Sequence, residues 1–520
     1  MRDLEWIEKG ERFDQDPSRP ARLALAHLSF RRGDPSRRFE AHFPGLGLLA
    51  LAQDLRTRPL NSIPAVLVKY FDEEGYASIA GMVEDIRSWL QPAERPMLGV
   101  TTYTSIIEHI ETFLSSFSRD NILIIAGGPH VTTSPMMKTA HIIVRGEGVE
   151  GLRHCISTVG TPEFGSRLVG LCYQRNGIVT RQPVRTQPIL SKISSPCYAY
   201  DLIPAKMQGI YATNLTRVLG EHPQVYVCTQ SCTARCTFCS TYLIHGKQSW
   251  RPADLVAADL RFLVKQMKCD AIEFHDDDLL QHPEFDRILR IMGELQVPWF
   301  CYARVDNIEE GTARELEEAG CKRVFLGVES MNQRKLDYFN KNTTVADNRR
   351  AIATLSHVGI GVVAGFIIGA PQDTTKDVLD DLDEFLGMPL FALSSSILSP
   401  DPGTVEYHRA SRRGVLSQET FPTPTVCDHI SSSDLAALEA VIDAEFFYRE
   451  VVWSKLIEGR NPNQIALIQN YYSEVAKDLR DAATDSADSM IRARAKQKIA
   501  QIELGLGLVM SIRPDPNTSG

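Results

Sequence analysis

The sequence has few of the features that would place it in a membrane or on nucleic acid. No apolar run approaches the roughly 20 residues that a membrane-spanning helix needs. Met1–Pro20 is rich in Asp, Glu and Arg and has no apolar core that could act as a signal peptide. The net charge of −9 gives no electrostatic reason to expect a nucleic-acid partner. We therefore expect a cytoplasmic protein without a membrane span.

Disulfide bonds are also not expected, because the 11 cysteines lie in a long chain without a secretory signal. The 520 residues are too many for one hydrophobic core, and 43% hydrophobic with 23% charged residues is an ordinary globular composition. Most of the cysteines stand singly and are expected to be small buried hydrophobes. Four of them fall together in one short stretch, as Cys228, Cys232, Cys236 and Cys239.

The first part of the chain alternates apolar runs with helical patterns. Helices are expected over 46–55 and 106–117, and apolar runs predict strands over 23–28, 63–68, 97–100, 122–126 and 141–144. The second strand is expected at an edge because it contains Pro64. Alternating strands and helices imply an α/β domain with a doubly wound, Rossmann-like parallel sheet, which we assign to residues 1–152. Such sheets bind ligands at the carboxyl ends of their strands.

Residues 153–220 lose this alternation and are expected to form a linker, after which the alternation returns. Six runs predict strands over 224–229, 270–275, 298–304, 323–328, 362–368 and 392–398, with Gly320 and Gly359 at helix ends. These units predict a partial (β/α)6 barrel over residues 221–405, with its chemistry at the carboxyl ends of the strands. Residues 406–520 are expected to be mainly helical, to close over the barrel mouth and to set substrate specificity.

The last three clustered cysteines, Cys232, Cys236 and Cys239, directly follow the first strand of this barrel. A loop with three and then two intervening residues can bring three thiolates onto one small site for a soft metal. Three ligands would leave one iron of a [4Fe–4S] cluster open to a substrate or cofactor. The alternatives are chance clustering and structural zinc with Cys228 as a fourth ligand, although zinc ligands are commonly paired well apart in sequence.

This loop, with Phe238 before its last cysteine, resembles the signature loop of radical S-adenosylmethionine (SAM) enzymes. The resemblance to class B members continues in Tyr302–Asp306, Ala319–Ser330, Gly365–Pro371 and Pro400–Thr404. It implies a [4Fe–4S] cluster on the three cysteines, with SAM bound at the open iron and cleaved to a 5′-deoxyadenosyl radical.

The resemblance further implies that Phe238 lies near the adenine of SAM and that Arg304 and Glu329 hold its polar groups. Asp276 and Asp277, at the end of the second barrel strand, would contact its amino group. The residues by themselves also allow simpler structural roles. Arg304 could pair with the nearby Asp306, and the acidic turn could be a solvated helix cap.

The domain in front resembles the cobalamin-binding domain that precedes the barrel in one radical SAM subclass. The matching segments are His42–Ala52, Leu98–Thr101, Ala126–Thr132 and Val144–Gly148. Glycine at strand ends permits close approach of the backbone to a bulky ligand. The cobalamin contacts implied by the resemblance are Tyr103, Gly127, Gly128, Pro129, His130, Gly146 and Glu147.

One departure from other cobalamin proteins concerns the cobalt ligand. The Asp-x-His-x-x-Gly motif that supplies a histidine to cobalt is absent from this sequence. Cobalamin would therefore bind base-off, without a histidine ligand, and His130 would be a loop residue near it. The departure leaves open that the domain keeps the fold without the cofactor.

The two resemblances predict a cobalamin-dependent radical SAM methyltransferase. Such an enzyme moves a methyl group from methylcobalamin to an unactivated carbon, or phosphorus, of a small molecule or natural-product precursor. The expected electron donor is a reducing protein such as flavodoxin or ferredoxin. The same cofactors also allow ring closure, ring contraction or anaerobic oxygenation, and a non-catalytic cobalamin sensor is an alternative of another class. Methylthio transfer is less expected, because no second cysteine triad precedes the barrel.

Overall fold

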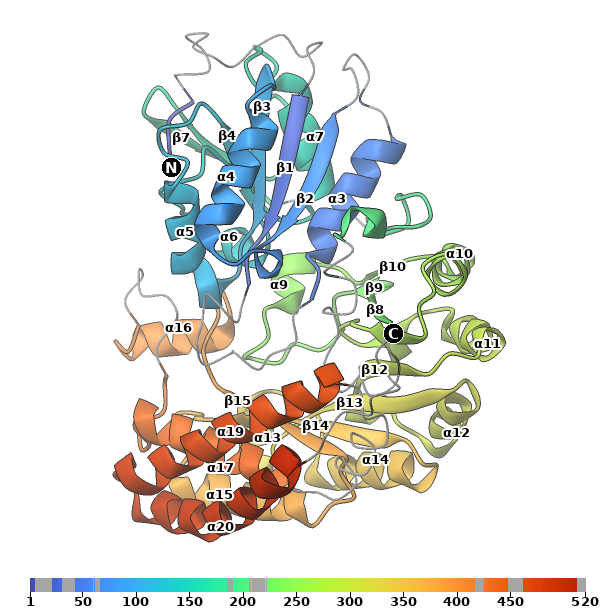
Figure 1. Ribbon diagram of the computed structural model, residues 1–520, viewed down its shortest axis with the longest axis vertical. Coiled ribbons are helices and arrows are strands. Elements are labelled where there is room, and N and C mark those ends of the chain that lie inside the picture. Colours follow the sequence, from blue (N-terminus) through green and yellow to red (C-terminus); the bar gives the residue numbers. More distant parts are fainter. Residues whose placement is uncertain are drawn as a thin grey trace.

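The chain forms two stacked α/β units with a group of helices beside the second (Figure 1). The computed structural model describes residues 1–4, 21–29, 43–58, 60, 66–184, 190–204, 207, 220, 222–416, 425–447 and 462–511. The first unit is drawn in blue to green and the second in green to orange. No helix in the described ranges is long and apolar enough to cross a membrane.

The first unit is a seven-stranded sheet with the strand order β2-β1-β3-β4-β5-β6-β7. Five strands are parallel, namely β1 (Ala21–His27), β2 (Leu67–Asp72), β3 (Arg95–Thr101), β4 (Leu123–Gly127) and β5 (Ile142–Val144). One face packs on α3 (Leu46–Thr57) and α7 (Gly148–Thr158), and the other packs on α4 (Ile79–Leu90) and α5 (Ile107–Ser115). Helices on both faces confirm the doubly wound fold, in which the strand order reverses between β1 and β3.

Two predictions for this unit need correction. The edge strand β2 begins at Leu67 rather than Ile63, and residues 61–65 lie outside the described part of the chain. The expected linker contributes two antiparallel strands to the sheet, β6 (Leu171–Arg175) and β7 (Ile178–Arg181), while α7 spans the boundary placed at 152. The signal for β6 and β7 was their turn, Asn176-Gly177, where both residues have a positive φ, as the tight hairpin turns favoured by twisted strands require.

The second unit is a six-stranded parallel sheet with the order β15-β14-β13-β12-β11-β8, and it confirms the predicted partial barrel. Its strands are β8 (Pro223–Tyr226), β11 (Ala271–Phe274), β12 (Trp299–Arg304), β13 (Cys321–Glu329), β14 (Gly361–Ile368) and β15 (Ala392–Ile397). The connecting helices are α10 (Ala253–Lys265), α11 (Phe285–Leu295), α12 (Glu310–Glu318), α14 (Val345–His357) and α15 (Thr375–Leu386). Gly320 and Gly359 follow α12 and α14 with positive φ, as predicted for helix ends.

The last part of the chain is helical, as predicted, but most of its described residues lie beside the barrel. Helices α17 (Ser432–Phe447), α19 (Pro462–Asp485) and α20 (Ser489–Ser511) pack together next to β15 and α15 (Figure 1). Only α16 (Val405–Arg412), among the described helices of this region, meets the cysteine loop at the barrel mouth. There the Glu406 backbone N–H donates to the Thr237 carbonyl at 3.1 Å.

A buried arginine ties the segment between the two units to the barrel. Arg251 is fully buried and pairs with Asp259 of α10, at 3.1 Å between Nη2 and Oδ1. Its Nη1 also donates to the carbonyls of Leu190 and Ile193, at 2.6 and 2.9 Å. Removing the guanidinium would leave the buried Asp259 carboxylate without its cation, with only the Tyr226 hydroxyl as a donor at 2.8 Å, and would remove the donor of both carbonyls.

We expect Arg251→Ala to lower the free energy of unfolding by about 3–5 kcal/mol, since it leaves one partner of a buried ion pair uncompensated. Urea denaturation followed by circular dichroism would measure this. The matched control is Arg261→Ala, which removes the exposed Arg261–Glu294 pair and should cost less than about 1 kcal/mol. Equal losses in the two variants would contradict the assigned role of Arg251.

Candidate functional site

One pocket lies between the two units, where the carboxyl ends of both parallel sheets meet. Its volume is about 400 Å³, and its lining comes from β1, β3, β4 and β5 on one side and from the ends of β8 and β11 on the other. The first unit contributes Leu25, Gly45, Gly99, Thr101, Tyr103, Gly127, Gly128, Pro129, Gly146 and Glu147, and the barrel contributes Val227, Thr229, Gln230, Ile244, His245, His275 and Asp277. A ligand in this pocket would contact both units.

The side formed by the first unit is shaped by glycines. Gly128 has φ +103°, and a Cβ there would lie 2.7 Å from both Thr101 Oγ1 and the Thr102 backbone nitrogen. Gly146 has φ +75°, and its N–H donates to Thr132 Oγ1 at 2.9 Å. These positions require glycine and leave a wall of backbone, which suits the close approach of a flat, bulky group such as a corrin. No described histidine of this unit lines the pocket, whereas His245 and His275 of the barrel do.

The cysteine loop forms the part of the barrel mouth nearest this pocket. It joins β9 (Thr229–Gln230) to α9 (Thr241–His245), a short helix that Figure 1 shows between the two units. Cys236 is buried, whereas Cys232 and Cys239 are partly exposed. Burial raises the pKa of the Cys232 and Cys239 thiols, so binding a metal cluster there would require both thiols to lose a proton.

Donor groups point at the sulfurs of this loop. The Ala234 N–H lies 3.4 Å from Cys232 Sγ, and Gln281 Nε2 lies 3.9 Å from the same sulfur. Arg304 Nη1 lies 3.8 Å from Cys236 Sγ. N–H donors and a guanidinium around two of the three cysteine sulfurs suit an anionic iron–sulfur cluster, whose sulfurs accept such bonds. Within the described ranges, no three His, Cys, Asp or Glu residues are grouped to hold a single metal ion.

Asp276 and Asp277 hold the two ends of the cysteine loop. Asp276 is buried, and its Oδ1 accepts from the Cys228 N–H and from the Thr229 backbone and hydroxyl. Asp277 Oδ2 accepts from the Ser231 N–H at 2.7 Å, and its Oδ1 accepts from the Thr241 hydroxyl at 3.1 Å. Asp276 is therefore a structural brace rather than an exposed contact, while Asp277 also lines the pocket.

Two more predicted residues, Arg304 and Glu329, lie at the ends of neighbouring barrel strands. Arg304 pairs with Asp306 at 2.9 Å, as the simpler reading of the sequence allowed, and its Nη2 also donates to the Lys341 carbonyl at 3.0 Å. Glu329 has φ +67°, an uncommon conformation for a residue other than glycine, and its carboxylate pairs with Lys341 Nζ at 2.8 Å. The structure thus places two ion pairs at these strand ends, and one of them includes Arg304, whose Nη1 lies 3.8 Å from Cys236 Sγ.

Phe238 and His130, which were predicted to lie near SAM and cobalamin, each contact other residues of the protein. The Phe238 ring packs edge-on against Phe339, with the ring centres 5.1 Å apart. His130 is buried and does not line the pocket, because the turn into α6 (Pro129–Thr133) directs its Nδ1 to Thr104 Oγ1 at 3.2 Å. Burial lowers the pKa of His130 to about 4, so it is neutral at physiological pH. The structure therefore places His130 behind the pocket wall.

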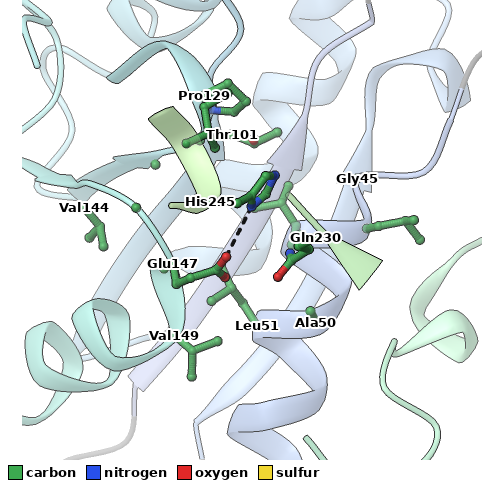
Figure 2. A pocket seen from close by; sticks show the side chains of 18 of the residues that line it. Gly45, Ala50, Leu51, Thr101, Pro129, Val144, Glu147, Val149, Gln230 and His245 are labelled. Atoms are coloured by element: carbon green, nitrogen blue, oxygen red, sulfur yellow. Dashed lines mark hydrogen bonds and ion pairs between the residues drawn. The ribbon is translucent and has the colours of Figure 1, made fainter. Parts of the chain in front are cut away.

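The pocket also includes the polar side chains of His245 and Gln230, which the sequence patterns did not single out, beside the predicted Glu147. Figure 2 shows His245, Glu147 and Gln230 around one side of the cavity, with His245 and Glu147 joined by a hydrogen bond. His245 and Gln230 belong to no recognised spacing. Their only sequence signal is position, since both stand within a few residues of the cysteine loop.

Comparison with known proteins now assigns the family. A family model described as the radical SAM superfamily matches residues 226–385, which include the cysteine loop and the four barrel strands β11, β12, β13 and β14. This chain contains a radical SAM domain. The radical SAM domain makes the chain an enzyme with an iron–sulfur cluster, and the three-cysteine loop lies within the matched residues.

Relatives and solved structures extend the likeness to the whole chain. An uncharacterised methyltransferase of Pyrococcus horikoshii is 26% identical over 436 residues, which are 79% of this chain and 89% of the relative. The anaerobic magnesium-protoporphyrin IX monomethyl ester cyclase of Rubrivivax gelatinosus is 27% identical over 60% of this chain and 59% of the relative. The structure of OxsB, a cobalamin-dependent SAM radical enzyme with aqua-cobalamin bound, aligns with a TM-score of 0.63 and 15% identity, covering 94% of this chain and 79% of OxsB. The chain therefore has the fold of cobalamin-dependent radical SAM enzymes.

The cysteine assignment predicts a sharp difference between neighbouring variants. We expect Cys236→Ala to lose nearly all iron after anaerobic reconstitution, because two remaining thiolates do not hold a cubane cluster. Cys228→Ala is the matched control and should retain its iron, since Cys228 is fully buried below the loop. Iron and sulfide analysis would measure both. If Cys228→Ala lost its iron and Cys236→Ala kept it, a ligand set that includes Cys228 would be favoured.

The backbone requirement at Gly128 predicts a second difference. Gly128→Ala should lower the free energy of unfolding by about 1–3 kcal/mol, because its φ is positive and its Cβ would meet backbone. Gly47→Ala should be neutral or stabilising by up to about 1 kcal/mol, because Gly47 lies in α3 with no atom within 4 Å of its Cβ position. Urea denaturation would compare them, and equal effects would show that the Gly128 backbone relaxes without cost.

Proposed function

We propose that this radical SAM enzyme is a cobalamin-dependent methyltransferase acting on a small molecule. The observation that carries the proposal is the shared pocket, which has the glycine-rich edge of the first sheet on one side and the barrel mouth on the other. A corrin at the glycine edge and SAM at the cysteine loop would face one cavity. The similarity over most of both chains to a relative named as a methyltransferase supports methyl transfer.

Each group of residues would have a defined task in this enzyme. Cys232, Cys236 and Cys239 would hold a [4Fe–4S] cluster, and Gly127, Gly128 and Gly146 would receive the corrin. Arg304 and Glu329 are charged, close to the loop and fixed by Asp306 and Lys341, so they can orient the polar groups of SAM. When bound, the cluster would supply the electron that cleaves SAM to a 5′-deoxyadenosyl radical, and the corrin would supply the methyl group.

Aromatic rings line the way from the pocket into the barrel. Phe43 of the first unit contacts His275 at 4.5 Å between ring centres, and His275 contacts Tyr302 at 4.7 Å. Tyr302 in turn stacks on Phe325 of the next strand at 4.9 Å. Burial lowers the pKa of His275, which keeps this imidazole neutral and compatible with the rings. We place the substrate against this wall, where the ring faces would contact an apolar or unsaturated part of it.

The remaining expectations follow from the chemistry of the cluster. A low-potential cluster needs a one-electron donor, and we propose a reduced flavodoxin or ferredoxin for this role. Such donors act in the cytoplasm, which is where we place the enzyme. The substrate is proposed to be a small molecule rather than a nucleic acid, in line with the net charge of −9.

A second candidate function is radical ring closure with the same cofactors. It is favoured by the similarity to the Rubrivivax gelatinosus cyclase, which covers 60% of this chain. The two functions differ in the product, because methyl transfer adds one carbon taken from SAM whereas ring closure adds none. A cobalamin sensor without catalysis is disfavoured, because the three cysteines stand together with Arg304, which points at Cys236 Sγ.

The proposal is tested by anaerobic purification, cluster reconstitution and addition of hydroxocobalamin, followed by gel filtration and metal analysis. We expect about four irons and one equivalent of cobalt to stay with each chain. Candidate substrates would then be supplied with methyl-deuterated SAM and a chemical reductant, and the deuterated methyl group should appear in the product. Cys236→Ala serves as the inactive control.

The contrary results are distinct. Iron without cobalt would leave a radical SAM enzyme whose first unit is only a scaffold. A chain that retains neither iron nor cobalt would rule out the proposed chemistry. A product formed without deuterium from the SAM methyl group would favour ring closure over methyl transfer.

A further inference from the structure

The helix α9 connects the two halves of the site. It begins two residues after Cys239 and ends at His245, where Gly246 has φ +68°. It packs against α6 of the first unit. The side chains of Leu243 in α9 and Thr133 in α6 both lie close to Gly403. Helix α9 therefore links the cysteine loop directly to the first unit.

A polar contact also joins α9 to the first unit inside the pocket. His245 Nδ1 lies 3.3 Å from Glu147 Oε1, and both side chains line the cavity (Figure 2). Glu147 is the N-cap residue of α7, where the helix dipole favours a negative charge. The pair is partly buried, with 29% of the His245 side chain and 16% of the Glu147 side chain exposed. It joins the edge that would hold a corrin to the helix that follows the cluster ligands.

The charges around His245 favour its protonated form. Burial by itself lowers the pKa of His245, but the hydrogen bond and charge of Glu147, together with the charge of Asp277, outweigh this and raise it. Glu147 comes from the loop before α7 and Asp277 from the end of β11. Asp277 is engaged by Ser231 and Thr241, so Glu147 is the direct partner. Neutral His275 also lines the pocket and adds no charge.

We propose that His245 is a positioning residue that, through Glu147, aligns the cysteine loop with the corrin pocket. This inference rests on the proposed function, because it requires a corrin at the glycine edge. The pair can fix the alignment because its hydrogen bond between α9 and the corrin edge is directional. The apolar contacts of Leu243 are not directional and fix no single position. Protonated His245 gives the stronger contact, so the alignment is firmest below the pKa of His245 and loosens as the pH rises through it.

The experiment uses the full chain with a reconstituted cluster and hydroxocobalamin as the probe. Affinity is measured by absorbance titration between about pH 6 and about pH 9, the range in which a histidine with a raised pKa loses its proton. His245→Gln, Glu147→Gln and the double variant form a mutant cycle. Exchange of the partners, with His245→Glu and Glu147→His in one chain, tests rescue. His357→Gln is the matched control, because His357 is an exposed residue in α14.

We expect wild-type affinity to fall as the pH rises, and each single variant to bind about fivefold or more weakly near neutral pH, in the range of typical coupling between sites. The variants should lose the pH dependence. The double variant should bind no more weakly than the weaker single variant, and the exchanged pair should recover affinity. The control should match wild type.

A second readout reports the alignment itself. In the dithionite-reduced protein, the magnetic interaction between cob(II)alamin and the reduced cluster is measured by electron paramagnetic resonance. We expect this interaction to be well defined in wild type and broadened in both single variants. Iron analysis of each variant shows that the cluster is retained, and Glu147→Gln, which lies in the other unit, replaces His245→Gln if the latter fails to fold.

The failures are distinguishable. If wild type binds no hydroxocobalamin, the proposed function falls and this inference with it. If wild type binds but both single variants keep its affinity, pH profile and magnetic interaction, the positioning role is overturned while the proposed function stands. Additive losses in the mutant cycle would also overturn it, because they would show that the two residues act separately.

Discussion

The arrangement of this enzyme depends on one constraint, namely that parallel strands bring their carboxyl ends to the same edge of a sheet. Two such sheets face each other at these edges, so the loops of both open into one pocket. Backbone N–H groups, glycine turns and strand-end side chains from both units are then concentrated in a small volume. The cysteine loop after β8 and the glycine turn after β4 meet there because each follows a strand that ends at the shared edge.

The polar residues at this edge have to be held before they can serve a cofactor. Oδ1 of Asp276 accepts hydrogen bonds from the backbone at the start of the cysteine loop, while its Oδ2 has no hydrogen-bond partner in the described structure. Burial raises the pKa of Asp276 to about 6, so keeping this brace charged at neutral pH has a cost. Burial likewise raises the pKa of Asp278 to about 7. The carboxylate of Asp278 lies close to Arg304 and Cys232. Asp276 thus holds the start of the loop, while Asp278 accepts from Gln281 and Asn307 beside it.

The sequence was informative where function or folding leaves a local pattern. Continuous apolar runs predicted the barrel strands, because both faces of a parallel sheet are covered, and cysteine spacing predicted the loop. Patterns failed where the deciding contact is distant in sequence. His130 was expected to lie in a loop near the cobalamin, yet a turn at Pro129 directs it to Thr104, and β6 pairs with β5 although 26 residues separate Val144 from its partner Leu171. His245 gained its role only because Glu147, 98 residues away, lies across the pocket.

The nature of the α9 connection also follows from what a two-cofactor site must do. A bulky corrin would occupy a pocket that both units line, so the contacts across this pocket bear on how it is held. The contact that α9 makes there is not built from core side chains, because α9 has no buried residue and carries a partly exposed ion pair at its end. Such a pair contributes little to global stability. It nevertheless acts at the point where the cysteine loop and the corrin edge meet, so a weak and reversible contact is enough to set their alignment.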